Sequence, residues 1–324
     1  MTRTHTPLTL APITLGANIM NRTSTILARD DLDINIAAFN HHLDAEGKAE
    51  KTIQLYTSAA RDLARFLRAN GMPLTVLNIR REHVESYLIS LRPRLSPATR
   101  NQNFRCLQAF WKYLMDEDEV KDSPLRNIAR PTIPETPPDR VTIDQMRALL
   151  AVCDGKTFPD RRDSAIFLLF YSSGIRLAEL TGLKLADVDH DRKQIRVTGK
   201  FHRTRDVRYG RLASRAIDRY LRARNLQPFA DNPAFWLGER GPLTVWGVSQ
   251  MIQRRAKQAN LDNIHAHAFR HGFAIGYLGK GGQEGELMQL AGWKSRSMVE
   301  RYAGQTAAER AQRSYDRYDP GEDL

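Results

Sequence analysis

Hydrophobic residues recur at helical spacing through most of the chain after residue 30. Between residues 52 and 67 they fall every three or four positions, which is the spacing of one helix face. These residues are Ile53, Tyr56, Ala60, Leu63, Phe66 and Leu67. Asn70-Gly71 then gives a helix stop signal. A second helix is predicted over residues 81–91.

A third helix is predicted to begin at Ser96-Pro97. Serine is a preferred N-cap, and proline fits the first helical position because its missing N–H would have no partner there. An apolar stripe follows, made of Phe104, Leu107, Trp111 and Leu114. We expect Trp111 to pack in the core of a small helical bundle, in preference to stacking on a base.

Five prolines interrupt the pattern between residues 123 and 141. Proline breaks both helices and strands, so this segment is predicted to be an extended linker. The predicted organisation is therefore a disordered arm at residues 1–30, a helical domain at 31–122, the linker at 123–141 and a second domain at 142–324.

The second domain is predicted to be mostly helical with one small antiparallel sheet. It begins with a capping box, Thr142 to Gln145. The period then changes, because Ile195 and Val197 alternate with polar neighbours and Val207 repeats the pattern. This alternation predicts a β-hairpin with a basic turn. Helical spacing returns after Thr244, so the predicted fold class is mainly α, with an α+β second domain.

The composition narrows the class of partner. The 324 residues carry a net charge of +12, which attracts polyanions such as DNA, although an ordinary basic protein would carry such a charge equally well. No stretch approaches the roughly 18 apolar residues of a membrane span. The cysteines, Cys106 and Cys153, lie in apolar stretches without metal-ligand spacing. They are predicted to be buried free thiols in a reducing compartment, and the chain to be cytoplasmic and nucleoid-associated.

Four short segments concentrate polar and aromatic residues that could carry chemistry. Taken singly, each has an ordinary structural interpretation: a surface ion pair, a solvated lysine, a histidine-rich helix and a packed tyrosine. A zinc site at the histidines is disfavoured, since neither a ligating cysteine nor an HExxH motif accompanies them. The segments are Ser173-Gly-Ile-Arg176-Leu-Ala-Glu179, Gly199-Lys200, His265-Ala-His267-Ala-Phe-Arg270-His271, and Gly292-Trp293 with Tyr302 nine residues after the tryptophan.

In this order and spacing, the four segments resemble the catalytic domain of the tyrosine recombinase (phage integrase) family, and in particular Xer-like site-specific recombinases. The resemblance covers roughly residues 140–305, and the helical bundle before it resembles the family's SAM-like core-binding domain. It implies a DNA recombinase or integrase that cleaves and rejoins strands through a 3′-phosphotyrosine. Such an enzyme needs no ATP, because the covalent bond conserves the energy of the broken phosphodiester, and the resemblance implies no metal or other cofactor.

The resemblance also implies a role for each matching residue. Tyr302 would be the nucleophile, and Arg176 and Arg270 would hold the non-bridging phosphate oxygens, which suit guanidinium groups. Lys200 would be the general acid for the leaving 5′-oxygen, and His267 a hydrogen-bonding or proton-transfer partner.

Trp293 stands where most members have histidine. Two further residues would support the site, Glu179 beside the first arginine and His271. An indole donates one hydrogen bond but cannot transfer a proton. Phe201 replaces the usual glycine after the hairpin lysine, and Tyr315 and Tyr318 lack the nine-residue spacing from Trp293.

Double-stranded DNA is the expected partner, held between the two domains mainly through phosphate contacts. The residues expected to contact it are Arg100, Arg105, Lys112, Arg203, Arg205, Arg254 and Arg255. The tail after residue 302 has apolar residues at helical spacing. In this family such a tail often packs on a neighbouring protomer, so the resemblance implies a tetramer on synapsed DNA, closed by head-to-tail contacts.

Two alternatives remain open from the sequence. A type IB topoisomerase shares the phosphotyrosine chemistry but only relaxes supercoils. A non-catalytic DNA-binding protein could keep the fold without the reaction. The separate helical bundle and the tail favour a recombinase, and Trp293 and Phe201 favour one that integrates a mobile element or plasmid.

Overall fold

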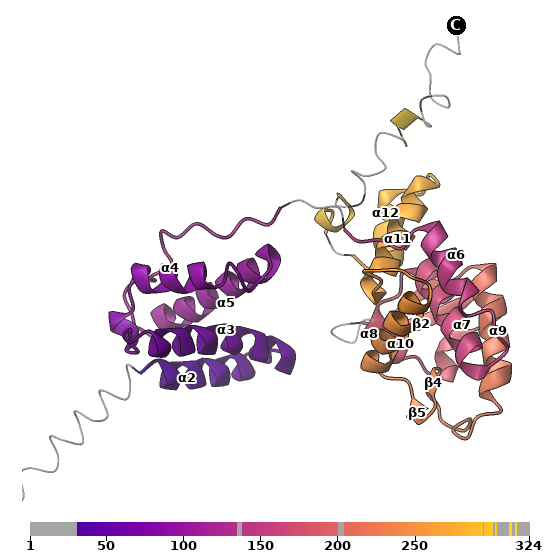
Figure 1. Ribbon diagram of the computed structural model, residues 1–324, viewed down its shortest axis with the longest axis horizontal. Helices are drawn as coiled ribbons and strands as arrows, with labels where there is room; N and C mark the ends of the chain where they lie inside the picture. Colours follow the sequence, from indigo (N-terminus) through magenta and orange to yellow (C-terminus); the bar gives the residue numbers. More distant parts are fainter. Residues whose placement is uncertain are drawn as a thin grey trace, which may run out of the picture. The chain divides into compact units, whose positions relative to one another are not determined.

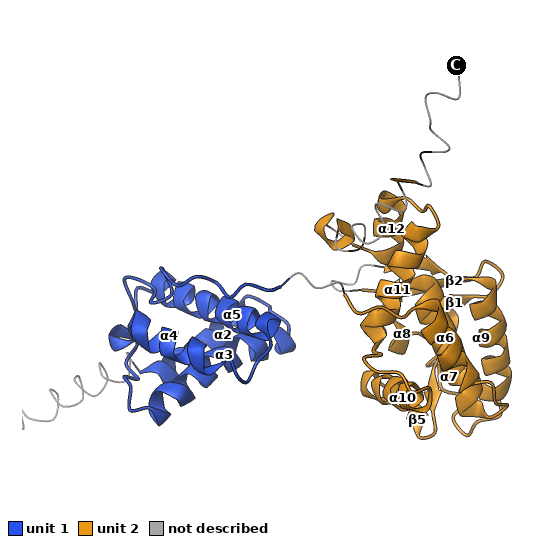
Figure 2. Cartoon of the chain, turned by 45° about the horizontal axis from the view of Figure 1, so that its top comes forward, with its two compact units in different colours: residues 1–135 blue, residues 136–324 orange. Residues whose placement is uncertain are grey.

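The computed structural model describes residues 31–134, 138–199, 204–293, 295–300, 302, 311, 312 and 315. The chain divides into two compact units, residues 1–135 and 136–324 (Figure 2). This division falls inside the segment predicted as a linker. The predicted N-terminal arm and most of the predicted tail lie outside the described residues.

The first unit is a helical bundle. Its helices are α2 (Leu32–Ala45), α3 (Glu50–Ala69), α4 (Arg81–Ser90) and α5 (Pro97–Asp116), with a short 3-10 helix η1 (Val76–Asn78). Helix α3 packs against the other three helices (Figure 1). Trp111 is fully buried, which confirms that it belongs to the core.

The predicted helix ends are confirmed in this unit. The Ser96 hydroxyl accepts a hydrogen bond from the Thr99 amide at 3.2 Å, with Pro97 in the first turn of α5. Helix α3 ends at Ala69, and Gly71 follows with φ of 63°, a conformation that glycine adopts without strain.

Residues 123–134 pack on this bundle, although the sequence predicts an extended linker there. Leu125 is buried in the bundle core. The Asn101 side chain donates to the Pro131 carbonyl at 2.6 Å and accepts from Arg130 at 2.6 Å. The apolar residues between the prolines favour burial over an extended path through solvent.

The second unit surrounds helix α7 (Phe158–Ser173). Phe167 and Phe170 of α7 stack on Phe269, with ring centroids 5.4 and 5.6 Å apart. Helices α6, α9 and α11 pack against α7 (Figure 1). The remaining helices of this unit are α6 (Ile143–Ala151), α8 (Leu177–Thr181), α9 (Arg211–Arg224), α10 (Val245–Gln258), α11 (Ala266–Gly279), α12 (Glu284–Ala291) and the 3-10 helix η2 (Leu185–Asp187).

A three-stranded antiparallel sheet contains the predicted hairpin. Its strands are β1 (Val188–Asp189), β2 (Gln194–Thr198) and β3 (Thr204–Arg208). Ile195 and Val197 face the core while Arg196 is exposed, as the alternation predicts. The last pair of the hairpin is Thr198 with Thr204, so Lys200, Phe201 and Arg203 fall between the strands, outside the described residues.

A second hairpin, β4 (Leu237–Gly238) and β5 (Gly241–Pro242), has no strand signal in the sequence because each strand has only two residues. The fold class is confirmed as mainly α with a small antiparallel sheet. Cys106 and Cys153 are confirmed as buried free thiols. No helix among the described residues is long and apolar enough to cross a membrane.

Candidate active site

Arg176 caps the N-terminus of α8. Helix α7 ends at Gly174, whose φ is 60° and whose missing side chain leaves room for the Phe273 ring. The chain then turns into α8, and the Arg176 amide donates to the Glu179 carboxylate at 3.0 Å. The sequence places this pair on one helix face, whereas the structure makes it a capping box with Arg176 just outside the helix.

Glu179 is a buried carboxylate shared by two arginines. Its Oε1 accepts from Arg176 Nη1 at 2.9 Å and from Arg205 Nη1 at 2.7 Å, while its Oε2 accepts from Arg205 Nη2 at 2.8 Å. Burial alone would raise the pKa of Glu179, but the hydrogen bonds from Arg205 and Arg176 and the positive charge of Arg205 bring it down to about 2. The carboxylate is therefore ionised at neutral pH.

Arg205 is thus engaged inside the protein, although the sequence suggested a DNA contact. Its side chain is only 19% exposed, and its fork pairs with Glu179 in a bidentate manner. A residue on the strand after a basic turn resembles a DNA contact in the sequence. Its partner lies 26 residues away and becomes visible only in the fold.

Arg270 is buried on α11, at 2% exposure. Its two terminal nitrogens donate to the carbonyls of Gly174 and Ala291. Burial, together with the charge of Arg176, lowers the pKa of Arg270 to about 10, so the guanidinium remains charged at neutral pH. Arg176 donates to the neighbouring Gly292 carbonyl at 3.1 Å, and both arginines therefore converge on the same turn.

Two histidines, His267 and His271, lie one turn apart on α11. The His267 and His271 ring centroids are 4.4 Å apart. His271 Nδ1 hydrogen-bonds to the Asp139 carbonyl at 2.7 Å. Partial desolvation, and then the charges of His271 and Arg270, lower the pKa of His267 to about 4. His267 is consequently a neutral imidazole at neutral pH.

Tyr302 and Trp293 complete the site. Their rings stack with centroids 5.1 Å apart and planes 7° from parallel. The Arg270 guanidinium carbon lies 5.1 Å from the centre of the Trp293 ring, and the His271 ring lies 5.2 Å from Tyr302. Tyr302 is 1% exposed and belongs to a small apolar core on α11 and α12, separate from the main core of the unit.

A cleft of about 1040 Å³ opens beside these groups. Arg176, Arg205 and Trp293 line it, together with Thr198 and Gly199 from the end of strand β2. Fixed guanidinium donors around a hollow suit an oxyanion whose charge grows during reaction. Among the described residues, no group of three His, Cys, Asp or Glu side chains is placed to hold a metal ion.

The structure thus brings Arg176, Glu179, His267, Arg270, His271, Trp293 and Tyr302 into one region of the second unit. Lys200 and Arg203 lie outside the described residues. The carbonyls of Ala291 and Gly292, which hold the two arginines, could not be predicted from the sequence. The glycine at position 292 does indicate a helix end in the sequence, and the structure confirms a left-handed C-cap to α12, with φ of 63°.

The residues expected to contact DNA from α5 do not share one surface. At 100° per residue, Arg105 and Lys112 lie on the same face, while Arg100 is roughly 140° away from Arg105. Lys112 pairs with Asp116 at 2.6 Å on the exposed side.

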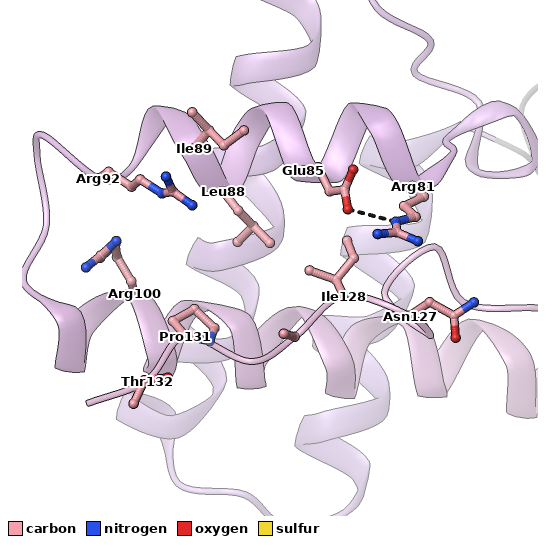
Figure 3. A pocket seen from close by; sticks show the side chains of 11 residues that line it. Arg81, Glu85, Leu88, Ile89, Arg92, Arg100, Asn127, Ile128, Pro131 and Thr132 are labelled. Atoms are coloured by element: carbon pink, nitrogen blue, oxygen red, sulfur yellow. Dashed lines mark hydrogen bonds and ion pairs between the residues drawn. The ribbon is translucent and has the colours of Figure 1, made fainter. Parts of the chain in front are cut away.

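Arg100 instead lines a groove of about 560 Å³ between α4, α5 and residues 127–132, where Arg92 lies near it (Figure 3). Arg100 Nε is buried without a hydrogen-bond partner among the described residues. At the other end of the groove, Arg81 is neutralised by Glu85 at 2.7 Å. Arg92 could not be predicted as part of this groove, because only the fold brings it beside Arg100.

Arg254 and Arg255, both expected to contact DNA, have different environments. The Arg255 side chain is 8% exposed and donates to Asp163 at 2.9 Å and Asp160 at 2.8 Å. It therefore ties α10 to α7. Arg254 is 55% exposed and donates one long hydrogen bond, of 3.4 Å, to Asp163, so most of its side chain is accessible to solvent.

Two family models match the chain. The model described as "Phage integrase family" covers residues 139–309, which contain the candidate site. The model described as "Phage integrase, N-terminal SAM-like domain" covers residues 36–120, the helical bundle. Together they account for both units.

Curated relatives match over nearly the whole chain. Tyrosine recombinase XerC from Myxococcus xanthus is 30% identical over 290 residues, covering 87% of this chain and 96% of the relative. XerC from Shewanella oneidensis is 28% identical and covers 84% and 90%.

Solved structures share the fold at lower identity. A lambda integrase dimer bound to a COC′ core site has a TM-score of 0.69 at 16% identity, over 87% of this chain and 80% of that one. XerH bound to a palindromic difH substrate has a TM-score of 0.67 at 18% identity, over 86% and 82%. The family matches and the 30% identical relative lead to one assignment. The chain belongs to the phage integrase family of tyrosine recombinases, enzymes that cleave and rejoin DNA strands.

Proposed function

We propose that this recombinase cleaves a specific DNA site with Tyr302 as the nucleophile and a 3′-phosphotyrosine as the intermediate. The observation that carries the proposal is the convergence of Arg176 and Arg270 on the Ala291–Gly292 turn, which leads directly into the Trp293–Tyr302 stack. Two cations are thereby fixed close to a tyrosine. This is the arrangement that attack on a phosphodiester requires.

The two arginines would bind the non-bridging oxygens of the scissile phosphate. The charge on these oxygens increases as the tyrosine attacks, and rigid guanidinium forks match their geometry. Both side chains are already oriented by backbone carbonyls, and Arg176 also by Glu179. Donors whose orientation is fixed before DNA binds lower the barrier.

In the cleavage step, a bond forms between Tyr302 Oη and phosphorus while the bond from phosphorus to the 5′-oxygen breaks. Lys200 would donate its proton to the leaving 5′-oxygen. The neutral imidazole of His267 can accept the phenol proton, whereas the Trp293 indole cannot. A 5′-hydroxyl of another strand then attacks the phosphotyrosine in the reverse sense and reseals the backbone.

Basic residues of both units would bind the DNA duplex through its phosphates. Arg92 and Arg100 offer two guanidinium groups at one end of the groove in the first unit (Figure 3). Arg105 and Lys112 present a second basic face, and Arg254 an exposed cation in the second unit.

Strand exchange requires more than one active site, so we assign the working form as a tetramer on two synapsed DNA duplexes. The helical spacing of the tail after residue 302 supports a contact with a neighbouring protomer. Crosslinking on DNA should yield species up to the tetramer with the full chain and only lower species when residues 303–324 are deleted.

The catalytic proposal is tested with a DNA site selected by binding from a random library. Wild type, Tyr302→Phe and Tyr315→Phe are incubated with this site in EDTA and quenched with SDS. A covalent adduct in wild type and Tyr315→Phe, and none in Tyr302→Phe, is expected. An adduct in Tyr302→Phe at the wild-type level would exclude Tyr302 as the nucleophile. Exchange of strands between two labelled sites would separate a recombinase from a topoisomerase.

A further inference from the structure

Arg205 occupies a position between three parts of the second unit. Its guanidinium pairs with Glu179 of α8 through two parallel hydrogen bonds of 2.7 and 2.8 Å. The same group lies over Gly292, where an added Cβ would be 3.2 Å from Arg205 Nε. Its backbone belongs to strand β3 and pairs with Val197 of β2. One side chain thus connects the hairpin, α8 and the turn before Trp293.

We infer that Arg205 is a positioning residue that fixes the β2–β3 hairpin, and with it Lys200, relative to the phosphate-binding arginines. The inference rests on the proposed function, in which Lys200 protonates the leaving 5′-oxygen. Arg205 follows Thr204, which closes the hairpin opposite Thr198, so it lies at the base of the turn that contains Lys200. The two bonds to Glu179 at this base fix strand β3 against α8.

The pairing geometry distinguishes Arg205 from a surface cation. Each carboxylate oxygen of Glu179 accepts one hydrogen bond from the Arg205 side chain and one from Arg176. The Glu179 side chain is 4% exposed. A bidentate pair fixes orientation as well as distance, and a lysine cannot reproduce it. The pair therefore sets the angle of the hairpin as well as its separation from α8.

Loss of Arg205 would leave the phosphate clamp in place. Glu179 would keep its bonds to the Arg176 side chain and amide, and Arg176 would keep the Gly292 carbonyl. The hairpin would lose its charged link to α8, while Ile195, Val197 and Val207 would keep their packing in the core. The expected defect is therefore in protonation of the leaving group, while binding of the phosphate by the two arginines persists.

The test compares two substrates that differ at one atom. In a normal site the leaving group is a 5′-oxygen, which needs a proton. In a site with a 5′-bridging phosphorothiolate the leaving group is a thiolate, which departs without a general acid because thiols are much stronger acids than alcohols. We expect Arg205→Gln to cleave the normal site about 100-fold more slowly than wild type. It should cleave the phosphorothiolate site within about threefold of wild type.

Arg205→Lys keeps the charge without the fork and should show the same selective rescue, with a smaller defect on the normal site. Arg196→Gln is the matched control, because Arg196 pairs with Asp206 across the same hairpin on its exposed side, at 3.2 Å. It should cleave both substrates as wild type does. Lys200→Ala gives the reference for a lost general acid, and Arg176→Gln for a lost clamp.

Two results would overturn the inference. In the first, Arg205→Gln and Arg205→Lys are slowed as much on the phosphorothiolate site as on the normal site, as Arg176→Gln is. In the second, both Arg205 variants cleave the normal site at the wild-type rate. Wild type itself separates these results from a failure of the proposed function. If wild type forms no tyrosine adduct with either substrate, the recombinase mechanism is wrong. If wild type cleaves both and selective rescue is absent, only the role of Arg205 is wrong.

Discussion

The Trp293 indole stacks on the Tyr302 phenol with the ring planes 7° apart, and the Arg270 guanidinium lies over the same indole. Trp293 therefore contacts both the proposed nucleophile and a proposed phosphate ligand. Most members of the family are expected to have a histidine here. In this chain the position contributes a flat apolar surface and one N–H donor, and we propose that it holds Tyr302 and Arg270.

Replacing Trp293 should separate stacking from hydrogen bonding. Trp293→Phe keeps an aromatic surface, and we expect its rate of adduct formation to fall by less than about tenfold. Trp293→Ala removes a large buried side chain and should cost about 3–5 kcal/mol of unfolding free energy. It should also slow adduct formation by at least about 100-fold, because Tyr302 loses its support. Urea unfolding and adduct assays measure the two effects, and equal rates for both variants would contradict the stacking role.

Glu179 should make stability depend on acid pH. Its pKa in the folded chain is about 2, below the ordinary glutamate value of about 4.3. The unfolded chain then binds more protons as the pH falls, so this contribution is fully present above about pH 4.3 and is lost as pH falls toward 2. Glu179→Gln lacks the contribution and leaves the charges of Arg176 and Arg205 without their carboxylate, at a cost of about 3–5 kcal/mol at neutral pH. The difference between the two proteins in urea unfolding should narrow between pH 5 and 3. A constant difference would contradict the assignment.

The adjacent residues Arg254 and Arg255 should give opposite results. Arg255→Gln leaves the fully buried Asp163 carboxylate with less compensation and should lower the unfolding free energy by about 3–5 kcal/mol. Arg254→Gln should leave stability within about 0.5 kcal/mol, since this side chain is mostly exposed. It should weaken DNA binding instead. Chemical unfolding and DNA titration test the pair, and similar stability losses in both variants would show that the burial difference has no energetic consequence.

The salt dependence of DNA affinity should show whether the groove of the first unit contacts DNA phosphates. If Arg92 and Arg100 each contact one DNA phosphate, the double change to glutamine should reduce the slope of log affinity against log salt by about 1.8. Arg81→Gln is the matched control from the same groove, because Glu85 already neutralises Arg81. Fluorescence anisotropy between 50 and 300 mM salt measures the slopes. An unchanged slope in the double variant would exclude phosphate contacts at this groove.

The sequence predicts the features of this fold that depend on neighbouring residues. The hairpin follows from the alternation around Ile195 and Val197, and helix α6 follows from the capping box, whose two hydrogen bonds are 2.9 and 3.2 Å. The catalytic region follows from spaced motifs that resemble a family. Each of these signals lies within a short stretch of chain.

Contacts between residues far apart in the chain could not be predicted from the sequence. Arg205 and Arg255 resemble DNA contacts until the fold brings Glu179 and Asp163 against them, from 26 and 92 residues away. Arg92 is unremarkable until it lies beside Arg100. Backbone carbonyls orient Arg176 and Arg270, and every residue has a carbonyl, so no pattern of side chains predicts which ones do so.

The most direct test of the central claim is to identify the residue and the DNA end that are joined. A nicked substrate traps the adduct, because the short 5′ fragment diffuses away before religation. After nuclease and trypsin digestion, mass spectrometry should find a nucleotide linked through its 3′-phosphate to the peptide of residues 302–310. A nucleotide on the peptide of residues 314–317, which contains Tyr315, or a linkage through a 5′-phosphate, would contradict it.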